Sequence, residues 1–293
     1  MISIAYPTKD DTAKIASFIS SLNKQNENHI GYIGTEKEEI ENALLNDFSD
    51  IPFHKSFILA YEQDKLIGVV GFDTDLENKQ AETWGPFVDH LEWETISMQM
   101  WDSILTLIPK EVSTISFFIN ELNVNSVQFA RTIGAVESGV HSILTIRNDQ
   151  LEEQYLDSEI DILEIQDQAA VSNLHNESFP NSYLSGNRML ENVNDFNKIF
   201  VCKRDGEFAG YIYVEANPEF GDASIEFFAV SPSYRGKGIG KALLLHGARW
   251  LLSFDSISKI QLCVNAKNEG AIHLYKKIGF EEIFTLSYLE KEL

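Results

Sequence analysis

The chain is poor in the residues that mark several classes of protein. Only two of its 293 residues are cysteine, too few for the disulfide framework of a small secreted domain. We interpret Cys202 and Cys263, which both lie in apolar stretches, as small core residues. The seven histidines are scattered without the spacing of metal ligands, so we expect no metal.

The chain also lacks long apolar runs. No stretch approaches the length of a membrane-spanning helix, and the first ten residues lack the apolar core of a signal peptide. We therefore expect a cytoplasmic protein that does not bind membranes. Apolar residues make up 44% of the chain, enough for globular cores, and its length suggests about two domains.

Basic side chains are scarce as well. The chain has 23 Lys and Arg against 45 Asp and Glu, a formal net charge of −22. This balance argues against nucleic acid as a partner, because nucleic acid binds basic surfaces. It is compatible with a cationic or neutral partner, although surplus acid is also a common source of solubility.

A glycine-rich loop joins a predicted strand to a predicted helix. Residues 224–230 are rich in aromatic and β-branched side chains, and residues 242–252 have the leucine content of a core-facing helix. Between them, Gly236, Gly238 and Gly240 leave backbone N–H groups bare at the helix entrance. Such donors, at the positive end of a helix dipole, can bind a pyrophosphate.

Two familiar phosphate motifs do not fit this loop. A P-loop needs a hydroxyl after its lysine, but Lys241 is followed by Ala242. A dinucleotide fingerprint needs a glycine three residues after Gly238, and Lys241 stands there. Taken alone, the remaining Gly-x-Gly is also compatible with a turn that binds nothing.

The whole run is more specific. Arg235-x-x-Gly238-x-Gly240, after a strand that ends in Val-x-Pro, resembles the acetyl-CoA signature of the GNAT superfamily of N-acyltransferases. In that family the loop amides hold the CoA pyrophosphate, so the resemblance implies acetyl-CoA as cosubstrate and no metal. The implied cofactor-binding residues are Ala229, Val230, Arg235, Gly236, Lys237, Gly238, Ile239, Gly240, Lys241 and Asn268.

A second hallmark follows the loop. Residues 259–265 read as a strand, and a helix is predicted next, with Asn268 as its N-cap and Gly279 just past its end. The pattern Asn-x-x-Ala-x-x-Leu-Tyr-x-x-x-Gly-Phe is typical of the same superfamily. The resemblance covers residues 159–293, about half of the chain.

The first half repeats the pattern of the second. Asn123 aligns with Asn268 at an offset of 145 (268 minus 123), and Gly68 aligns with Gly210 at an offset of 142. The first half has therefore lost three residues between these anchors, in the segment of the phosphate loop. That segment, residues 89–95, has no glycine and three acids, which would repel a pyrophosphate.

These observations predict an α/β (α+β) protein with two tandem GNAT-like domains, each a mixed, mostly antiparallel central sheet flanked by helices. We expect residues 1–150 to be a degenerate domain without a pyrophosphate loop and residues 151–293 to be catalytic. The boundary is expected in the polar, acidic stretch 147–159. The first domain could serve as a scaffold or as a wall of the acceptor pocket.

The resemblance implies direct acyl transfer from acetyl-CoA to an amine in a ternary complex. An alkylammonium with a pKa of about 10 needs a base before it can attack. A donor must meet the developing oxyanion, and the leaving thiolate needs a proton. The resemblance assigns the general acid to Tyr275, where the first half has Ala130, and the oxyanion donor to the N–H near Val230. Tyr275 could instead be a core residue on the buried face of its helix. Asn268 is expected to cap its helix and touch the pantetheine arm.

The base is predicted to be Glu226. It lies in an apolar strand four residues before Val230, so both side chains are expected on one face, and burial would raise its pKa. It could instead be a hydrogen-bonded carboxylate or the partner of an arginine. Asp222 and Glu215 are the reserve candidates.

The acceptor is expected to bind residues 173–188. There Glu177, Phe179 and Tyr183 could line a pocket for an amine, although a helix–loop–helix surface is equally compatible. The resulting hypothesis is an N-acetyltransferase that acts on a primary amine of a small molecule or peptide. The alternative is a non-catalytic acyl-CoA-binding or scaffolding protein.

Overall fold

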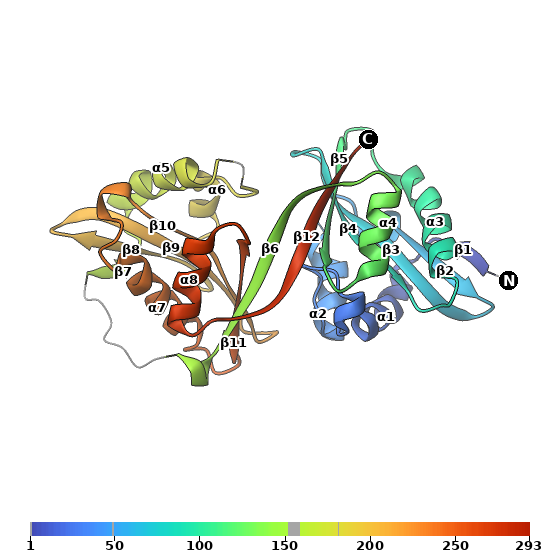
Figure 1. Cartoon of the computed structure of the whole chain (residues 1–293), viewed down its shortest axis with the longest axis horizontal. Coiled ribbons are helices and arrows are strands. Elements are labelled where there is room, and N and C mark those ends of the chain that lie inside the picture. The colour runs from blue at the N-terminus through green and yellow to red at the C-terminus, as the bar shows by residue number, and fades with distance from the viewer. Residues whose placement is uncertain (1, 49, 152–158, 181) are drawn as a thin grey trace. The chain divides into compact units, whose positions relative to one another are not determined.

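The computed structural model describes residues 2–48, 50–151, 159–180 and 182–293. The chain forms two compact units (Figure 1). One comprises Met1–His141 with Phe284–Leu293, and the other comprises Ser142–Ile283. The division thus falls nine residues before the expected boundary at 150, inside a strand that spans residues 136–147. Within the stretch expected to hold the boundary, residues 152–158 lie outside the described residues.

The first unit is a mostly antiparallel sheet with helices. Its strand order is β1-β2-β3-β4-β5-β12-β6; β4 and β5 run parallel, whereas the pairs β1–β2, β2–β3, β3–β4 and β5–β12 are antiparallel. The strands are β1 (Ile2–Ala5), β2 (Phe57–Glu62), β3 (Lys65–Asp75), β4 (Gln80–Val88), β5 (Thr114–Asn120), β6 (Val136–Arg147) and β12 (Glu281–Glu292). The helices are α1 (Thr12–Asn23), α2 (Lys37–Asn42), α3 (Trp93–Ile104) and α4 (Val124–Thr132).

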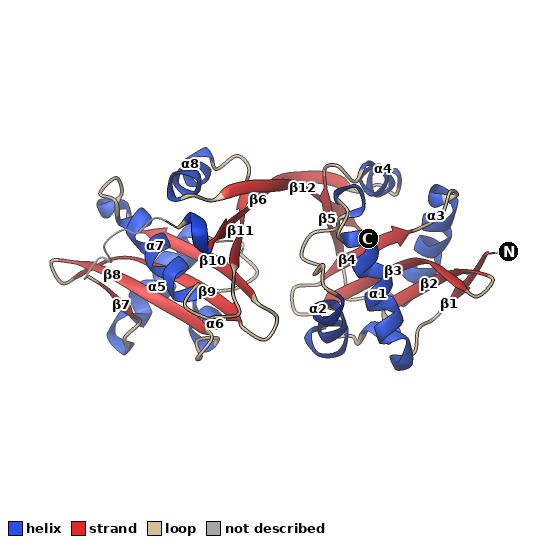
Figure 2. Cartoon of the chain, turned by 90° about the horizontal axis from the view of Figure 1, so that it is seen from below, coloured by secondary structure: helices blue, strands red, loops and turns tan. Residues whose placement is uncertain are grey.

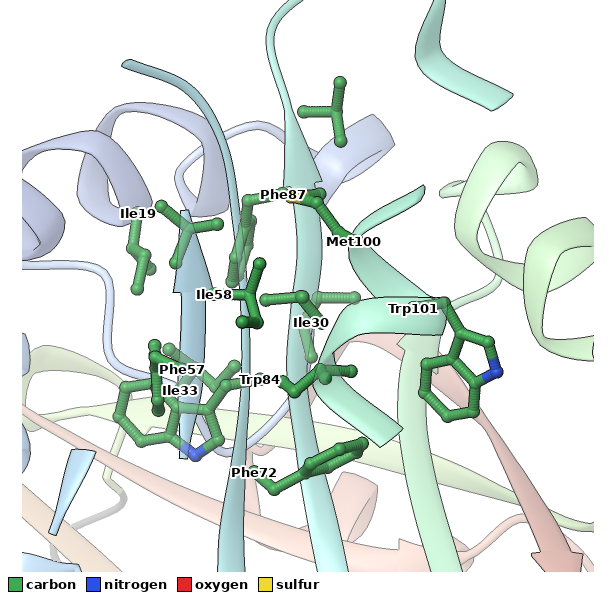
Figure 3. Packing of buried hydrophobic residues seen from close by; sticks show 14 of the residues in the cluster. Ile19, Ile30, Ile33, Phe57, Ile58, Phe72, Trp84, Phe87, Met100 and Trp101 are labelled. Atoms are coloured by element: carbon green, nitrogen blue, oxygen red, sulfur yellow. The ribbon is translucent and has the colours of Figure 1, made fainter. Parts of the chain in front are cut away.

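One hydrophobic core holds this unit together (Figure 3). On one side of the sheet, Trp101 of α3 packs edge-on against Phe72, with ring centroids 5.8 Å apart. Phe57 and Trp84 belong to the same core, with ring centroids 5.9 Å apart. Burial of such rings is the main driving force for this layered packing.

The second unit repeats the arrangement. Its order is β7-β8-β9-β10-β11, followed by the end of β6; β10 and β11 run parallel, whereas the pairs β7–β8, β8–β9 and β9–β10 are antiparallel. The strands are β7 (Ile160–Ile162), β8 (Asn197–Arg204), β9 (Glu207–Asn217), β10 (Asp222–Val230) and β11 (Lys259–Asn265). The helices are α5 (Gln168–Ser178), α6 (Gly186–Glu191), α7 (Ile239–Leu251) and α8 (Glu269–Ile278). Short 3₁₀ turns occupy Lys9–Asp11, Asn26–Asn28, Phe53–Lys55, Leu105–Leu107, Asn148–Gln150, Ile165–Asp167 and Pro232–Tyr234, and a π turn occupies Ala43–Asp47.

Alternation along β9 separates two cores in this unit. Ile212 and Val214 pack with α7 and α8, whereas Tyr211 and Tyr213 pack with α5 and α6. Figure 1 shows α5 and α6 on one side of β8, β9 and β10 and α7 on the other. Because successive strand residues point to opposite faces, the sheet has two different chemical surfaces.

Two strands are shared between the halves of the sequence. β6 begins in the first unit and ends in the second, and β12 does the reverse. The two strands run side by side (Figures 1 and 2). In the first unit, β12 pairs with β5 from Leu286↔Asn120 to Glu292↔Thr114. Each unit is therefore completed by a strand segment from the other half.

The internal repeat is confirmed at the level of strands. β3 and β9 start 142 residues apart, and β5 and β11 start 145 residues apart (259 minus 114). The residues that follow β4 and β10 also make equivalent bonds to the neighbouring strand. Asp89 N–H donates to Ile67 O, and Ser231 N–H donates to Ala209 O, each over 2.9 Å.

Two local expectations are wrong. The helix predicted at 242–252 begins three residues earlier, at Ile239, because Gly238 adopts a left-handed φ of 82° and serves as the N-cap. Cys202 is buried as expected, but Cys263 is exposed. It lies on β11 beyond the point where this strand is paired with β10.

Candidate functional site

The loop after β10 presents its backbone toward open space. Gly236 and Gly238 have φ values of 74° and 82°, and a Cβ added to either would meet no heavy atom within 4 Å. The first bond into α7 runs from Ala242 N–H to Gly238 O over 3.1 Å. The N–H groups of the three preceding helix residues therefore have no intrahelical acceptor. This is an open nest of donors at the start of a 13-residue helix.

Basic side chains surround this nest. Arg235 Nε donates to Val230 O over 3.1 Å, which ties the loop to the end of β10. Lys237 Nζ lies 4.9 Å from the ring centroid of Tyr234. Lys241 follows on the first turn of α7. Cations beside bare amides match the charge of a diphosphate.

The strands beside the loop separate. β10 and β11 are paired in register at Ser224↔Gln261, and β10 continues six residues further to Val230. Ser231 N–H points to β9, where it donates to Ala209 O. Strand N–H groups alternate in direction, so the N–H of Val230 points to the other edge, toward the gap between β10 and β11.

Tyr275 lies on α8 next to this gap. Its side chain is only 6% exposed, and its ring packs edge-on against Phe228 and Phe280, with centroids 5.8 and 5.7 Å away. Burial raises the pKa of the Tyr275 hydroxyl well above its ordinary value. No hydrogen bond to this hydroxyl is found among the described residues, so the protonated group can donate to a ligand.

Asn268 caps α8 as predicted. Its side-chain oxygen accepts the Ala271 N–H over 3.2 Å, and its own N–H donates to Asn265 O over 2.8 Å. Gly279 ends the helix with a φ of 116°. Local chemistry accounts for both ends of this element.

Glu226 and Val230 do not share a face, and that expectation is wrong. The β9–β10 register shifts between Ile225 and Phe227, so a bulge at Glu226 interrupts the alternation. Before it, Ile225 packs in the core under α7; after it, Phe227 packs in the core under α5. Val230 packs on the α7 side.

Glu226 instead faces the α5–α6 connection. Its Oε2 accepts the Tyr183 hydroxyl and its Oε1 accepts the Ser224 hydroxyl, both over 2.5 Å. The reserve candidate Glu215 lies on the neighbouring strand, opposite Ser224, and accepts the Tyr213 hydroxyl over 2.5 Å. Burial, and secondarily the charge of Glu226, raise the pKa of Glu215. These groups form a two-carboxylate cluster on one face of the sheet.

Of the other residues predicted for the acceptor side, two lie on this face and two do not. Tyr183 and Phe179 join this face through Phe227, whose ring centroid lies 5.5 and 5.1 Å from theirs. Glu177 is on the exposed side of α5, and Asp222 is at the far start of β10, opposite Asn217.

Sequence reasoning missed His175, Tyr211 and Tyr213. His175 is fully buried and bonds the Tyr211 hydroxyl over 2.6 Å and Leu184 O over 2.7 Å. The available signal was the i, i+2 spacing of the two tyrosines in β9, which places both on one face.

The equivalent gap in the first unit is closed. β4 and β5 are paired only at the start, up to Glu82↔Ser116. Beyond that point, the edge of β5 pairs with the segment after α1: Gly31 N–H donates to Phe118 O over 2.7 Å, and Asn120 N–H donates to His29 O over 3.2 Å. We call residues 29–31 the plug segment.

The loop of the first unit is closed as well. Only residues 89–92 separate β4 from α3. The N–H of Glu92 is taken by His90 Nδ1 over 3.0 Å, and Asp89 adds a carboxylate 3.1 Å from Lys65 Nζ. Ala130 is fully buried where the second unit has its tyrosine.

Neither a metal-binding cluster nor a membrane-spanning helix is found in the described part of the chain. It contains no group of three or more His, Cys, Asp or Glu side chains that could hold a metal ion. No helix there is both long and apolar enough to cross a membrane.

Sequence relatives match the second unit. Residues 168–280 match the model of the acetyltransferase (GNAT) family. Mycothiol acetyltransferase of Streptomyces avermitilis is 32% identical over 81 residues, which cover 28% of this chain and 26% of that protein. Spermidine N(1)-acetyltransferase of Escherichia coli K12 is 35% identical over 82 residues, 28% of this chain and 44% of that protein. The chain thus spans less than half the length of these relatives.

Solved structures match the whole chain. A GCN5-related N-acetyltransferase from Sphaerobacter thermophilus has a TM-score of 0.73 at 17% identity and covers 99% of this chain and 95% of its own. A tandem GNAT protein from the clavulanic acid biosynthesis pathway has a TM-score of 0.69 at 14% identity, with 100% and 98% covered. The predicted fold is confirmed: a tandem GNAT fold with mixed sheets flanked by helices.

Proposed function

Because residues 168–280 match the model of the acetyltransferase (GNAT) family, we propose that the second unit binds acetyl-CoA and transfers its acetyl group to a primary amine. The observation that carries this proposal is the open nest of main-chain donors at Gly236–Gly240 beside a gap between β10 and β11. A diphosphate fits this nest, since its oxygens need donors and a positive field. Acetyl-CoA supplies an activated thioester when bound.

Groups of the second unit are assigned to each part of the bound acetyl-CoA. Arg235, Lys237 and the amides from Gly236 to Lys241 hold the diphosphate, and Ala229, Val230 and Asn268 line the path of the pantetheine arm. Val230 N–H is aimed at the gap and supplies the donor for the carbonyl oxygen.

Proton transfer is assigned to two side chains. Glu226 accepts one proton from the acceptor ammonium, and Tyr275 gives its hydroxyl proton to the sulfur as the C–S bond breaks. The second proton of the amine, lost as the C–N bond forms, restores the Tyr275 hydroxyl. The bulge at Glu226 supports this division, because it turns the carboxylate to the α5–α6 face while Tyr275 stays with the α7–α8 core. Base and acid thus approach the gap from opposite faces.

The acceptor is proposed to be the primary amine of a small molecule. The acid-rich face formed by Glu215 and Glu226 attracts a cation, and two relatives of this unit are named for spermidine and mycothiol. A peptide amine remains an outcome of the screen below. We assign no acetyl-CoA binding to the first unit, whose gap holds the plug segment. We place the reaction in the cytoplasm.

A thiol-release screen tests the proposal. Acetyl-CoA would be offered with amino acids, polyamines, aminoglycosides and basic peptides. We expect release with at least one amine, and Tyr275→Phe should lower kcat roughly 10²-fold while the acetyl-CoA Kd stays within about twofold. Tyr288→Phe, a half-buried tyrosine of the first unit, is the matched control.

The outcomes separate the two candidate functions. Acetyl-CoA binding without thiol release to any acceptor would favour the non-catalytic acyl-CoA-binding protein. Full activity of Tyr275→Phe would remove this hydroxyl from the mechanism.

A further inference from the structure

His175 has its protonation fixed by its neighbours. The ring is fully buried on α5, with Nε2 2.7 Å from Leu184 O and Nδ1 2.6 Å from the Tyr211 hydroxyl. A carbonyl oxygen only accepts, so Nε2 carries the hydrogen. Burial lowers the pKa of His175, so the ring is neutral and Nδ1 accepts from Tyr211.

The α5–α6 connection is attached to this ring. The Ser182 hydroxyl donates to Leu184 O over 2.5 Å, the same oxygen that His175 holds. Tyr183 lies between these two residues, and its hydroxyl donates to Glu226 Oε2. The Tyr183 side chain is otherwise 66% exposed, so the backbone at Leu184 decides where its hydroxyl reaches.

The surroundings of His175 are apolar. Its ring centroid is 4.7 Å from that of Phe227 and 5.3 Å from that of Phe179. An apolar side chain of similar volume would fill this place without the desolvation cost of two ring nitrogens. The imidazole therefore contributes two directional hydrogen bonds, which hold one carbonyl of the α5–α6 connection and one hydroxyl of β9 in fixed positions.

We propose that His175 is a positioning residue of the acceptor side: by holding Leu184 O it places the Tyr183 hydroxyl on Glu226 and so orients the carboxylate. The inference rests on the proposed function, because it takes Glu226 as the group that receives the acceptor's proton. It assigns His175 no contact with acetyl-CoA or the acceptor.

Four variants test this role. His175→Phe removes both bonds, His175→Gln keeps an amide donor that can reach Leu184 O, Tyr183→Phe removes the hydroxyl on Glu226, and the fourth variant combines His175→Phe with Tyr183→Phe. We expect His175→Phe and Tyr183→Phe each to lower kcat/KM for the acceptor roughly tenfold. His175→Gln should recover most of the loss, and the acetyl-CoA Kd should not change.

The double variant gives the decisive comparison. If His175 acts through Tyr183, His175→Phe should cost less than about twofold once the Tyr183 hydroxyl is gone. Full additivity, or a loss of acetyl-CoA affinity in His175→Phe, would show a merely structural role and overturn the inference.

A spectroscopic readout separates this inference from the proposed function. The ¹³C signal of the Glu226 carboxyl should move in the same direction in His175→Phe and Tyr183→Phe, and stay in place in His175→Gln, whether or not any amine is acetylated. An unchanged signal in His175→Phe overturns the positioning role. Absence of acetyl transfer by the unaltered chain counts against the proposed function alone.

Discussion

The two units differ at the place where their two parallel central strands separate. In each, a parallel pair of strands is joined only at its start and then separates, at Ser224↔Gln261 in one and from Gln80↔Thr114 to Glu82↔Ser116 in the other. Separation leaves strand N–H and C=O groups without partners, and such groups must be satisfied by chain, water or ligand. In the first unit the plug segment pairs with the free edge of β5, whereas in the second unit no described segment is seen to fill the gap between β10 and β11.

The closure of the first unit is imperfect. His29 and Asn120 meet through a main-chain bond, yet His29 Nδ1 and Asn120 Nδ2 are buried without a hydrogen-bond partner in the described part of the chain. Unsatisfied buried groups cost free energy. The comparison therefore teaches that where two parallel strands separate, another segment of the chain can complete the free strand edge, at a cost in stability when its polar side chains stay unsatisfied.

Removing Phe284–Leu293 should have the largest effect on stability, and the effect should be confined to the first unit. This segment pairs with all of β5 and buries Leu286 and Leu289, so its loss should abolish cooperative unfolding of the first unit. The second unit should keep its acetyl-CoA affinity, measured by calorimetry. Leu289→Ala is the graded control and should cost about 2–4 kcal/mol. Unaltered unfolding of the shortened chain would show that the exchanged strand is dispensable.

Gly238→Trp should abolish acetyl-CoA binding, with at least a roughly 10²-fold rise in Kd, because a large side chain would occupy the nest and strain a left-handed residue. Leu91→Trp, at a fully exposed position in the corresponding loop of the first unit, should leave Kd unchanged. Titration calorimetry measures both. Equal losses in the two variants would end the distinction between an open and a closed unit.

Acid should remove the stability that the neutral, buried ring of His29 gives the first unit. Burial lowers the pKa of His29 to about 4, so the folded state binds fewer protons than the unfolded state at this group between pH 6.5 and 4. Stability from this group is present above pH 6.5 and is lost as the pH falls toward 4. We expect His29 to account for a loss of about 1–2 kcal/mol between pH 7 and 5, measured in urea unfolding as the difference between the unaltered chain and His29→Gln.

His29→Gln should flatten this dependence, whereas His273→Gln, at an exposed site on α8, should not. Tryptophan fluorescence can follow the units separately, since Trp250 is the second unit's tryptophan and Trp84, Trp93 and Trp101 belong to the first. An unchanged pH dependence in His29→Gln would contradict the assignment to the plug segment.

The helix caps offer the finest comparison. Asn123 and Asn268 are equivalent N-caps, but Asn123 is buried and its Nδ2 also lies 3.5 Å from His29 O. Alanine should cost about 1 kcal/mol at Asn268 and about 0.5–1 kcal/mol more at Asn123. Denaturant unfolding measures the difference, and a larger loss at Asn268 would argue against the added role of Asn123.

Much of the fold and part of the site could be predicted from local patterns. The repeat offsets placed β3 over β9 and β5 over β11, and the Asn268 cap and Gly279 terminator marked α8 within one residue. The nest at Gly236 and Gly238 was also foreseen, because positive φ and a helix entrance leave a glycine signature.

Other features depended on partners far along the chain. The bulge that turns Glu226 away from Val230 is set by its register with β9, and nothing in the alternation of β10 signals it. The anchor at His175 depends on Tyr211, which is 36 residues later.

Local chemistry thus decided which segments are strands, where helices begin, and that one loop leaves its main-chain donors bare at a helix entrance. Those properties depend on neighbours within a few residues, so they can be read from the chain. The exchange of β6 and β12, the plug in the first unit and the face on which each carboxylate lies were decided by folding. They come from strand pairing between distant residues, whose backbone bonds depend little on side-chain identity.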